Sequence, residues 1–240
     1  MRDVQLSVDF VHGTPYPLQV ITDMGRICYQ SEPRELCSCQ FDTPPKPSKC
    51  ADCGSYGVSV RDTEAFTHML IKRKHFSVLE HVSVGLKLTM DRGLTHEAVR
   101  HRLASFSQES TRFCNYLKAT FGSEIQVVEP PWMKPASHGI WYDQMLSAEK
   151  AYFALLEVGE PPEFARSVLP TCLKAEIGLT ANAREWRHIL GMRLVGEAGR
   201  PHPQMVLVMR KAAVRLLQWC PTLFEDIVVG SGVSCLSENP

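Results

Sequence analysis

The sequence predicts an α+β fold, in which one domain of residues 1–240 contains a mixed or antiparallel sheet flanked by helices. Three observations lead to this prediction. Apolar and polar residues alternate without a break over residues 82–90, which is the period of a half-buried strand. Other segments, such as residues 62–73, place apolar residues at helical spacing. The 240 residues, 44% of them hydrophobic, suffice to bury one large core.

The first half of the chain is expected to alternate strands and short helices. Residues 4–10 alternate and predict an opening strand. The strand of residues 82–90 should end in a turn at Asp91, and Thr95 should cap a short helix that extends to Leu103. Residues 104–110 contain three serines and are predicted to form a loop.

Capping residues and prolines divide the second half. Asn182, with Glu185 three positions later, has the pattern of a capping box at the start of a helix that contains Trp186. The other elements predicted here are a short strand at residues 125–128, a long helix ending near Gly159, a helix from Pro161, a strand at residues 173–179 and a helix at residues 206–217.

The charge balance argues against two classes of partner. Lysine and arginine total 26, as do aspartate and glutamate, so no global field attracts nucleic acid or an anionic membrane. The N-terminus has no apolar run typical of a secretion signal, and no stretch approaches the length of a membrane span. The sequence therefore predicts a cytoplasmic protein that binds any anion through locally clustered arginines.

The tripeptide Arg100-His101-Arg102 is followed by seven residues and Ser110. Two guanidiniums and an imidazole offer many hydrogen-bond donors, as phosphates and a redox-active heterocycle require. An isolated tripeptide of this kind is also consistent with a solvated basic turn. The serines, Gln108 and Arg112 that follow it add a polar segment whose side chains could surround a nucleotide.

The stretch RHRLASFSQESTRF resembles the signature of flavin-dependent thymidylate synthases. Two further blocks resemble that family in the expected order. The first is the segment from His75 to His81, whose histidines and Glu80 would otherwise suggest a metal site, although their spacing matches no standard ligand set. The second runs from Arg166 to Arg193, where Arg193 falls on an apolar helix stripe and either snorkels or binds a ligand.

The resemblance implies a homotetramer that binds flavin adenine dinucleotide (FAD) and methylates dUMP. The carbon would come from methylenetetrahydrofolate, the hydride from reduced FAD, and NADPH would reduce the flavin. It assigns Ser110 and Arg193 as catalytic groups. It assigns the nucleotide to Arg100, Gln108, Ser110, Arg112, Arg166 and Arg193. It assigns the flavin to His75, Ser77, Arg100, His101, Arg102, Leu103, Ser107, Asn182, Arg184 and His188.

Two features bear on the chemistry. Ser110 has no adjacent base in the sequence, so we expect it to position and polarise the nucleotide rather than to attack it. Glu97 stands where the family commonly has a glutamine that contacts the nucleotide. A carboxylate at this position would repel a phosphate unless it were paired with an arginine.

Residues 34–60 form a cysteine-rich insertion that is not typical of the family. Its thiols, Cys37, Cys39, Cys50 and Cys53, could form a tetrahedral zinc site, although the first pair is closer in sequence than usual. Free thiols are the alternative, and a disulfide fits less well in a chain without an export signal. Two other functions remain open: a different pyrimidine-nucleotide modification on the same fold, such as hydroxymethylation, and a zinc-stabilised binding module without catalysis.

Overall fold

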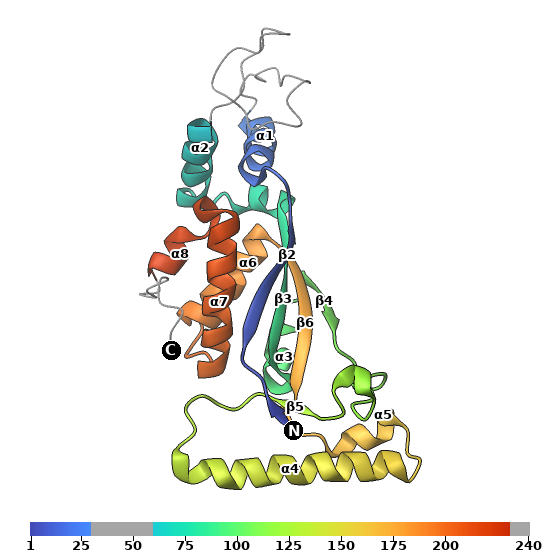
Figure 1. Cartoon of the computed structure of the whole chain (residues 1–240). Helices are drawn as coiled ribbons and strands as arrows, with labels where there is room; N and C mark the ends of the chain where they lie inside the picture. Colours follow the sequence, from blue (N-terminus) through green and yellow to red (C-terminus); the bar gives the residue numbers. More distant parts are fainter. Residues whose placement is uncertain (30–59, 231–240) are drawn as a thin grey trace.

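The computed structural model describes residues 1–29 and 60–230 (Figure 1). The predicted cysteine insertion, including Cys37, Cys39, Cys50 and Cys53, lies outside the described residues, so the zinc site stays a prediction. The described part is an α+β domain built around an antiparallel sheet, as the sequence predicts. No helix in the described ranges is long and apolar enough to cross a membrane.

The main sheet has four antiparallel strands in the order β2-β3-β6-β4. They are β2 (Ser7–Gly13), β3 (Ser83–Asp91), β6 (Lys174–Asn182) and β4 (Ala104–Gln108). A separate parallel pair, β1 (Arg2–Asp3) and β5 (Gln126–Val127), lies at the end of the domain near the N-terminus (Figure 1). The sheet is therefore assembled from strands that are distant in sequence.

Helices cover one face of this sheet. Helices α6 (Ala183–Leu190) and α7 (Pro203–Trp219) lie along that face, and α8 (Glu225–Gly230) lies outside them (Figure 1). The main core fills the interface, where the fully buried Trp186 of α6 donates its indole N–H to the carbonyl of Val84, 2.9 Å away. Helices α1 (Pro17–Tyr29) and α2 (Val60–Lys72) lie together at one end of the sheet (Figure 1).

A second core closes the opposite end. The long helix α4 (Pro135–Glu157) crosses beneath the sheet, beside the short α5 (Pro162–Ala165) (Figure 1). Tyr152 and Tyr116 are buried there around Ile125. This core supports the segment between β4 and β5, which contains Ser110.

The segment that carries the arginine–histidine tripeptide differs from its prediction. Helix α3 (Arg92–Ala98) begins directly after β3, and Asp91 caps it by accepting from the N–H of Leu94 at 2.8 Å, so the predicted cap at Thr95 and the turn at Asp91 are wrong. The tripeptide lies in the turn after α3, not on the helix. Residues 104–108 form strand β4 instead of a loop, because pairing with β6 satisfies their backbone groups.

The second face of the sheet carries polar and charged side chains. Lys87 of β3 pairs with Asp9 of β2 at 3.3 Å and lies 3.9 Å from Glu176 of β6. Ser105 and Ser107 of β4 are exposed, whereas Ala104 and Phe106 pack against the main core. Because side chains alternate along a strand, Ser107 points to the face away from α6 and α7.

Candidate functional site

The histidine block forms the first part of the site. His75 precedes a 3₁₀ helix, Phe76–His81, and both lie beside the first turn of α6. Arg184 of α6 is ion-paired with Glu80. Together with the end of α2, these elements line a pocket of about 530 Å³ whose walls are Leu70, Lys74, His75, Phe76, Ser77, Val78 and Arg184.

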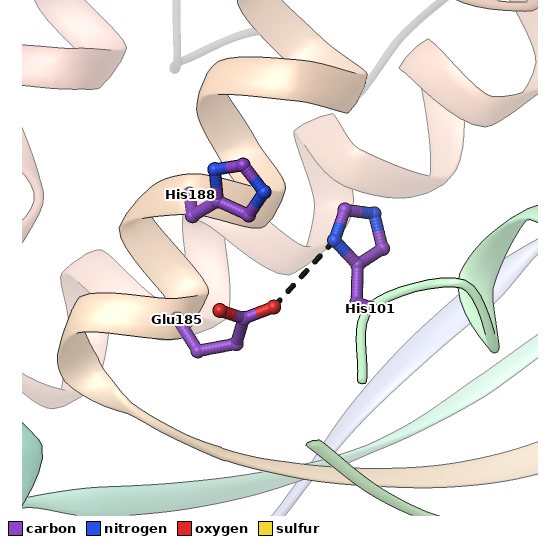
Figure 2. Close-up of side chains that lie close together, drawn as sticks. All are labelled: His101, Glu185 and His188. Carbon is purple, nitrogen blue, oxygen red and sulfur yellow. Dashed lines mark ion pairs between the residues drawn. The ribbon is translucent and has the colours of Figure 1, made fainter. Parts of the chain in front are cut away.

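Asn182 begins α6 as its N-cap. Its side chain accepts a hydrogen bond from the N–H of Glu185 at 2.8 Å, which confirms the predicted cap. The side chain of Glu185 does not return to the helix start as a capping box requires. It points instead towards His101 and His188 (Figure 2). The cap therefore leaves a carboxylate available inside the site.

His101, Glu185 and His188 form a cluster in which their potential ligand atoms all lie within 4.8 Å of one another (Figure 2). Oε1 of Glu185 is 3.6 Å from Nδ1 of His101, and both side chains are buried. The His101 and His188 rings meet edge to face, with their centroids 5.6 Å apart. Two imidazoles and a carboxylate are groups that could hold a divalent metal or form a hydrogen-bonded chain.

Electrostatics favour the uncharged ring of His101. Burial lowers the pKa of His101 to about 4, and the charges of Arg193 and His188 act in the same direction. Burial also raises the pKa of Glu185, against the opposing effect of His188 and Arg184. The imidazole of His101 is thus held neutral at physiological pH.

Arg193 lies next to this cluster. The predicted helix stripe is wrong at this residue, because α6 ends at Leu190 and residues 191–195 form a π-helical turn closed by the N–H of Gly196 on the carbonyl of Gly191 at 2.9 Å. The guanidinium of Arg193 reaches α3. Its Nη1 is 3.1 Å from Oε2 of Glu97 on α3, and its Nε donates to Nε2 of His101, in the turn after α3, at 3.2 Å. Arg193 is therefore paired rather than snorkelling.

Ser110 belongs to a second polar group. Its Oγ accepts from the backbone N–H of Arg112 at 3.3 Å, and within the described ranges no imidazole or carboxylate bonds to it. The guanidinium of Arg112 lies 3.4 Å from Glu163. Arg166 donates to the hydroxyl of Thr111 at 3.3 Å. Ser110, Arg112 and Arg166 are thus brought together, and their role in nucleotide binding stays a prediction.

Glu109 anchors this group and was missed by the sequence reasoning. One of its carboxylate oxygens accepts from the hydroxyl of Tyr116 at 2.8 Å, and the other accepts from Lys174 at 3.0 Å. Burial and this carboxylate raise the pKa of Tyr116, so the phenol remains a donor. Glu109 fixes the start of the Ser110 turn. Only its place inside the arginine-to-serine motif could have indicated it.

The remaining candidates do not converge within one chain. Arg100, Arg102 and Leu103 are exposed, and in the described part of the chain neither guanidinium makes a hydrogen bond or ion pair. Ser107 points to the opposite face of the sheet from His188. Gln108 donates its amide to Thr95 Oγ at 3.0 Å, which leaves its carbonyl oxygen for a ligand.

The family described as "Thymidylate synthase complementing protein" matches residues 9–222, most of the chain and all of the elements that carry the site. The chain belongs to this family. Flavin-dependent thymidylate synthases of Geobacter sulfurreducens and Mycobacterium tuberculosis are each 29% identical to it. The first match spans 97% of this chain and 89% of the relative, and the second spans 85% and 77%.

A solved structure has the same fold as this chain. A UMP/dUMP methylase, PolB, from Streptomyces cacaoi, bound with 5-Br dUMP, superimposes with a TM-score of 0.71. The alignment covers 96% of this chain and 97% of that structure, at 18% identity. The likeness therefore establishes the α+β fold with its antiparallel sheet, and the family match establishes the membership.

Proposed function

We propose that this family member is a flavin-dependent thymidylate synthase, which converts dUMP to dTMP with methylenetetrahydrofolate as carbon donor and reduced FAD as hydride donor. NADPH would reduce the flavin. The observation that carries the proposal is the Arg193 guanidinium, held between Glu97 and His101 with donors still free. Relatives named flavin-dependent thymidylate synthase over nearly the whole chain support it.

Arg193 is prepared for planar recognition of the nucleotide. Its Nε, Nη1 and Nη2 already donate to Nε2 of His101, Oε2 of Glu97 and the carbonyl of Glu97, at 3.2, 3.1 and 3.4 Å. One N–H on each terminal nitrogen remains, and the side chain is 23% exposed. These two remaining donors could reach a pyrimidine edge or a phosphate. Since the guanidinium is already oriented, binding loses little side-chain entropy.

Arg112 and Arg166 supply a second anion-binding point near Ser110. Their partners, Glu163 and Thr111, hold them at long distances of 3.4 and 3.3 Å, so a phosphate could replace these contacts. Ser110 contributes a hydroxyl without an adjacent base. We assign it to positioning and polarising the nucleotide, with Arg193 stabilising negative charge that develops on the pyrimidine ring.

The pocket beside α6 has the chemistry that a flavin nucleotide needs. Phe76 and Val78 offer apolar walls, and Arg184, Lys74 and His75 offer donors for phosphate or ring atoms. Bound FAD would supply the hydride that completes the methyl group. The chain's own residues would bind and orient FAD and dUMP. The neutral ring of His101 lies between Glu185 of α6 and Arg193, which is assigned to the nucleotide.

We also propose that the active site is completed by a second subunit of a homotetramer. Arg100 and Arg102 are exposed and unpaired in the described part of one chain. Leu103, which precedes β4, is 74% exposed. Two cations beside an exposed leucine suit a contact between copies that share ligands. Light scattering of the purified protein would measure the assembly, and a monomer would refute this arrangement.

The function is tested with purified full-length protein, dUMP, methylenetetrahydrofolate, FAD and NADPH. Mass spectrometry should find dTMP, and the product should disappear when the folate or the flavin is omitted. An Arg193→Ala variant should form no measurable product, whereas Arg210→Ala, at an exposed position of α7, should retain full activity. A hydroxymethylated product, or protein that neither binds flavin nor forms dTMP, would refute the proposal.

A further inference from the structure

We infer that Glu185 is a positioning residue, which fixes the tautomer of His101 and through it holds the guanidinium of Arg193 in place for the nucleotide. The three residues come from two distant segments. Glu185 lies on α6, His101 in the turn after α3, and Arg193 in the π-helical turn that follows α6. Glu185 and Arg193 thus approach the same imidazole from opposite sides.

Donor and acceptor counts decide the state of His101. A guanidinium only donates hydrogen bonds, so Nε of Arg193 at 3.2 Å requires a lone pair on Nε2 of His101. A neutral imidazole with that lone pair carries its proton on Nδ1. Nδ1 faces Oε1 of Glu185 at 3.6 Å, and an ionised carboxylate only accepts (Figure 2). The Nε2 lone pair of His101 therefore faces Arg193, and its Nδ1 proton faces the carboxylate of Glu185.

The same count disfavours a metal at this cluster as it is arranged. A metal on Nδ1 of His101 would displace the proton to Nε2, where it would oppose the N–H of Arg193 at 3.2 Å. Metal binding would then require Nε of Arg193 to leave His101. The Arg193 contact thus favours a hydrogen-bonded chain over metal coordination, although the three side chains are close enough for either.

The chain runs from one carboxylate to another. Oε1 of Glu185 lies 3.6 Å from Nδ1 of His101, Nε2 of His101 accepts from Arg193, and Arg193 donates to Glu97. Both side chains at the His101–Glu185 end are buried, with 5% and 7% exposed, so water competes weakly for this contact. Without Glu185, the Nδ1 proton of His101 would be buried without an acceptor. The ring would then turn, and Arg193 would lose one of its anchors.

This inference rests on the proposed function only for the identity of the ligand, dUMP. The direct readout is the tautomer itself, seen by nitrogen NMR of protein labelled with 15N-histidine, with His101 assigned by its loss in His101→Gln. Wild type should show the proton on Nδ1. Glu185→Gln keeps an acceptor oxygen and should keep this tautomer, whereas Glu185→Leu should move the proton to Nε2 or give a mixture.

Calorimetry of dUMP binding tests the consequence for Arg193. Glu185→Leu should weaken binding roughly tenfold, and Glu185→Gln should stay within about threefold of wild type. In a His101→Gln background, Glu185→Leu should add nothing, because Glu185 acts through His101. Glu157→Leu, a matched change at an exposed site on α4, should leave affinity unchanged.

Several outcomes would overturn the inference. They are a proton on Nε2 of wild-type His101, equal loss of affinity in the Gln and Leu variants, additive effects in the His101→Gln background, and stoichiometric Zn²⁺ binding that disappears specifically in Glu185→Gln. Wild type that does not bind dUMP at all would refute the proposed function instead, and the tautomer measurement would still test the role of Glu185.

Discussion

Arg193 and Glu97 form an ion pair between two segments far apart in the chain, with Nη1 3.1 Å from Oε2. The sequence alone suggested that the Glu97 carboxylate would repel a nucleotide phosphate unless an arginine paired with it. The structure supplies that arginine. Glu97 thereby becomes part of the binding arrangement, because it orients the guanidinium on two atoms, its carboxylate and its backbone carbonyl.

Glu97→Gln should strengthen dUMP binding. The amide keeps a hydrogen-bond acceptor for Arg193 but removes a negative charge, so the net potential at the site becomes more positive. We expect an affinity gain of roughly threefold to tenfold at low salt, and a smaller gain at high salt where charges are screened.

Calorimetry at two salt concentrations would measure this effect. Glu157→Gln, which removes the same charge from an exposed position of α4, serves as the control. Weaker binding by Glu97→Gln would show that the carboxylate itself contacts the ligand or that its charge is needed to hold Arg193.

Arg193→Lys should lose most of the nucleotide affinity. Lysine keeps the charge but presents no planar fork, so it cannot contact Glu97 and His101 and still offer two further donors to the nucleotide. We expect dUMP binding to weaken by about 10- to 100-fold, on the scale of one lost bidentate contact. Arg210→Lys is the matched control on an exposed surface of α7. Near-normal dUMP titrations of Arg193→Lys would mean that charge alone suffices.

Ser110→Ala should bind dUMP with affinity within about tenfold of wild type and still form product. The Oγ of Ser110 accepts only from the backbone of Arg112 in the described part of the chain, and no base is placed to activate it. Single-turnover product formation and calorimetric dUMP binding would be measured together. If product formation ended while binding stayed intact, Ser110 would have a direct chemical role.

The sequence predicted what local patterns determine. Strand β3 follows from an unbroken alternation, and Asn182 caps α6 because its side chain bonds to a residue three positions away. Strand β4 was missed because its serines obscured the alternation, and its stability comes from pairing with β6. The contact of Arg193 with Glu97 crosses 96 residues, and no local pattern encodes that proximity.

Acid should destabilise the protein partly through His101. Burial lowers the pKa of His101 from 6.5 to about 4, so the unfolded chain takes up this proton first as pH falls. The free energy of unfolding therefore decreases between pH 6.5 and 4, by at most about 3 kcal/mol from this residue. Burial raises the pKa of Glu185, which acts in the opposite direction because the folded chain then binds that proton more readily.

His101→Gln should thus lose less stability than wild type between pH 6.5 and 4.5, as measured by urea denaturation at several pH values. His96→Gln provides a control, since His96 is exposed on α3. Parallel curves for His101→Gln and wild type would contradict the prediction and would place the acid sensitivity elsewhere.

Asp226→Ala should destabilise the fold more than Arg187→Met. Arg187 of α6 is buried and donates to both carboxylate oxygens of Asp226, at 2.7 and 2.6 Å, whereas the Asp226 side chain is half exposed. Removing Asp226 leaves the buried Arg187 cation without its carboxylate and should lower the free energy of unfolding by about 3 kcal/mol. Removing Arg187 leaves a carboxylate that water can solvate. Urea denaturation should show this order, and Glu225→Ala, which breaks an exposed pair with His68, should cost under about 1 kcal/mol.

The Arg187 guanidinium also lies 5.4 Å from the centroid of the Phe76 ring, and Phe76 lines the pocket assigned to the flavin. Asp226→Ala should therefore weaken flavin binding, measured by titration with FAD. Unchanged flavin affinity would show that this ion pair does not influence the site.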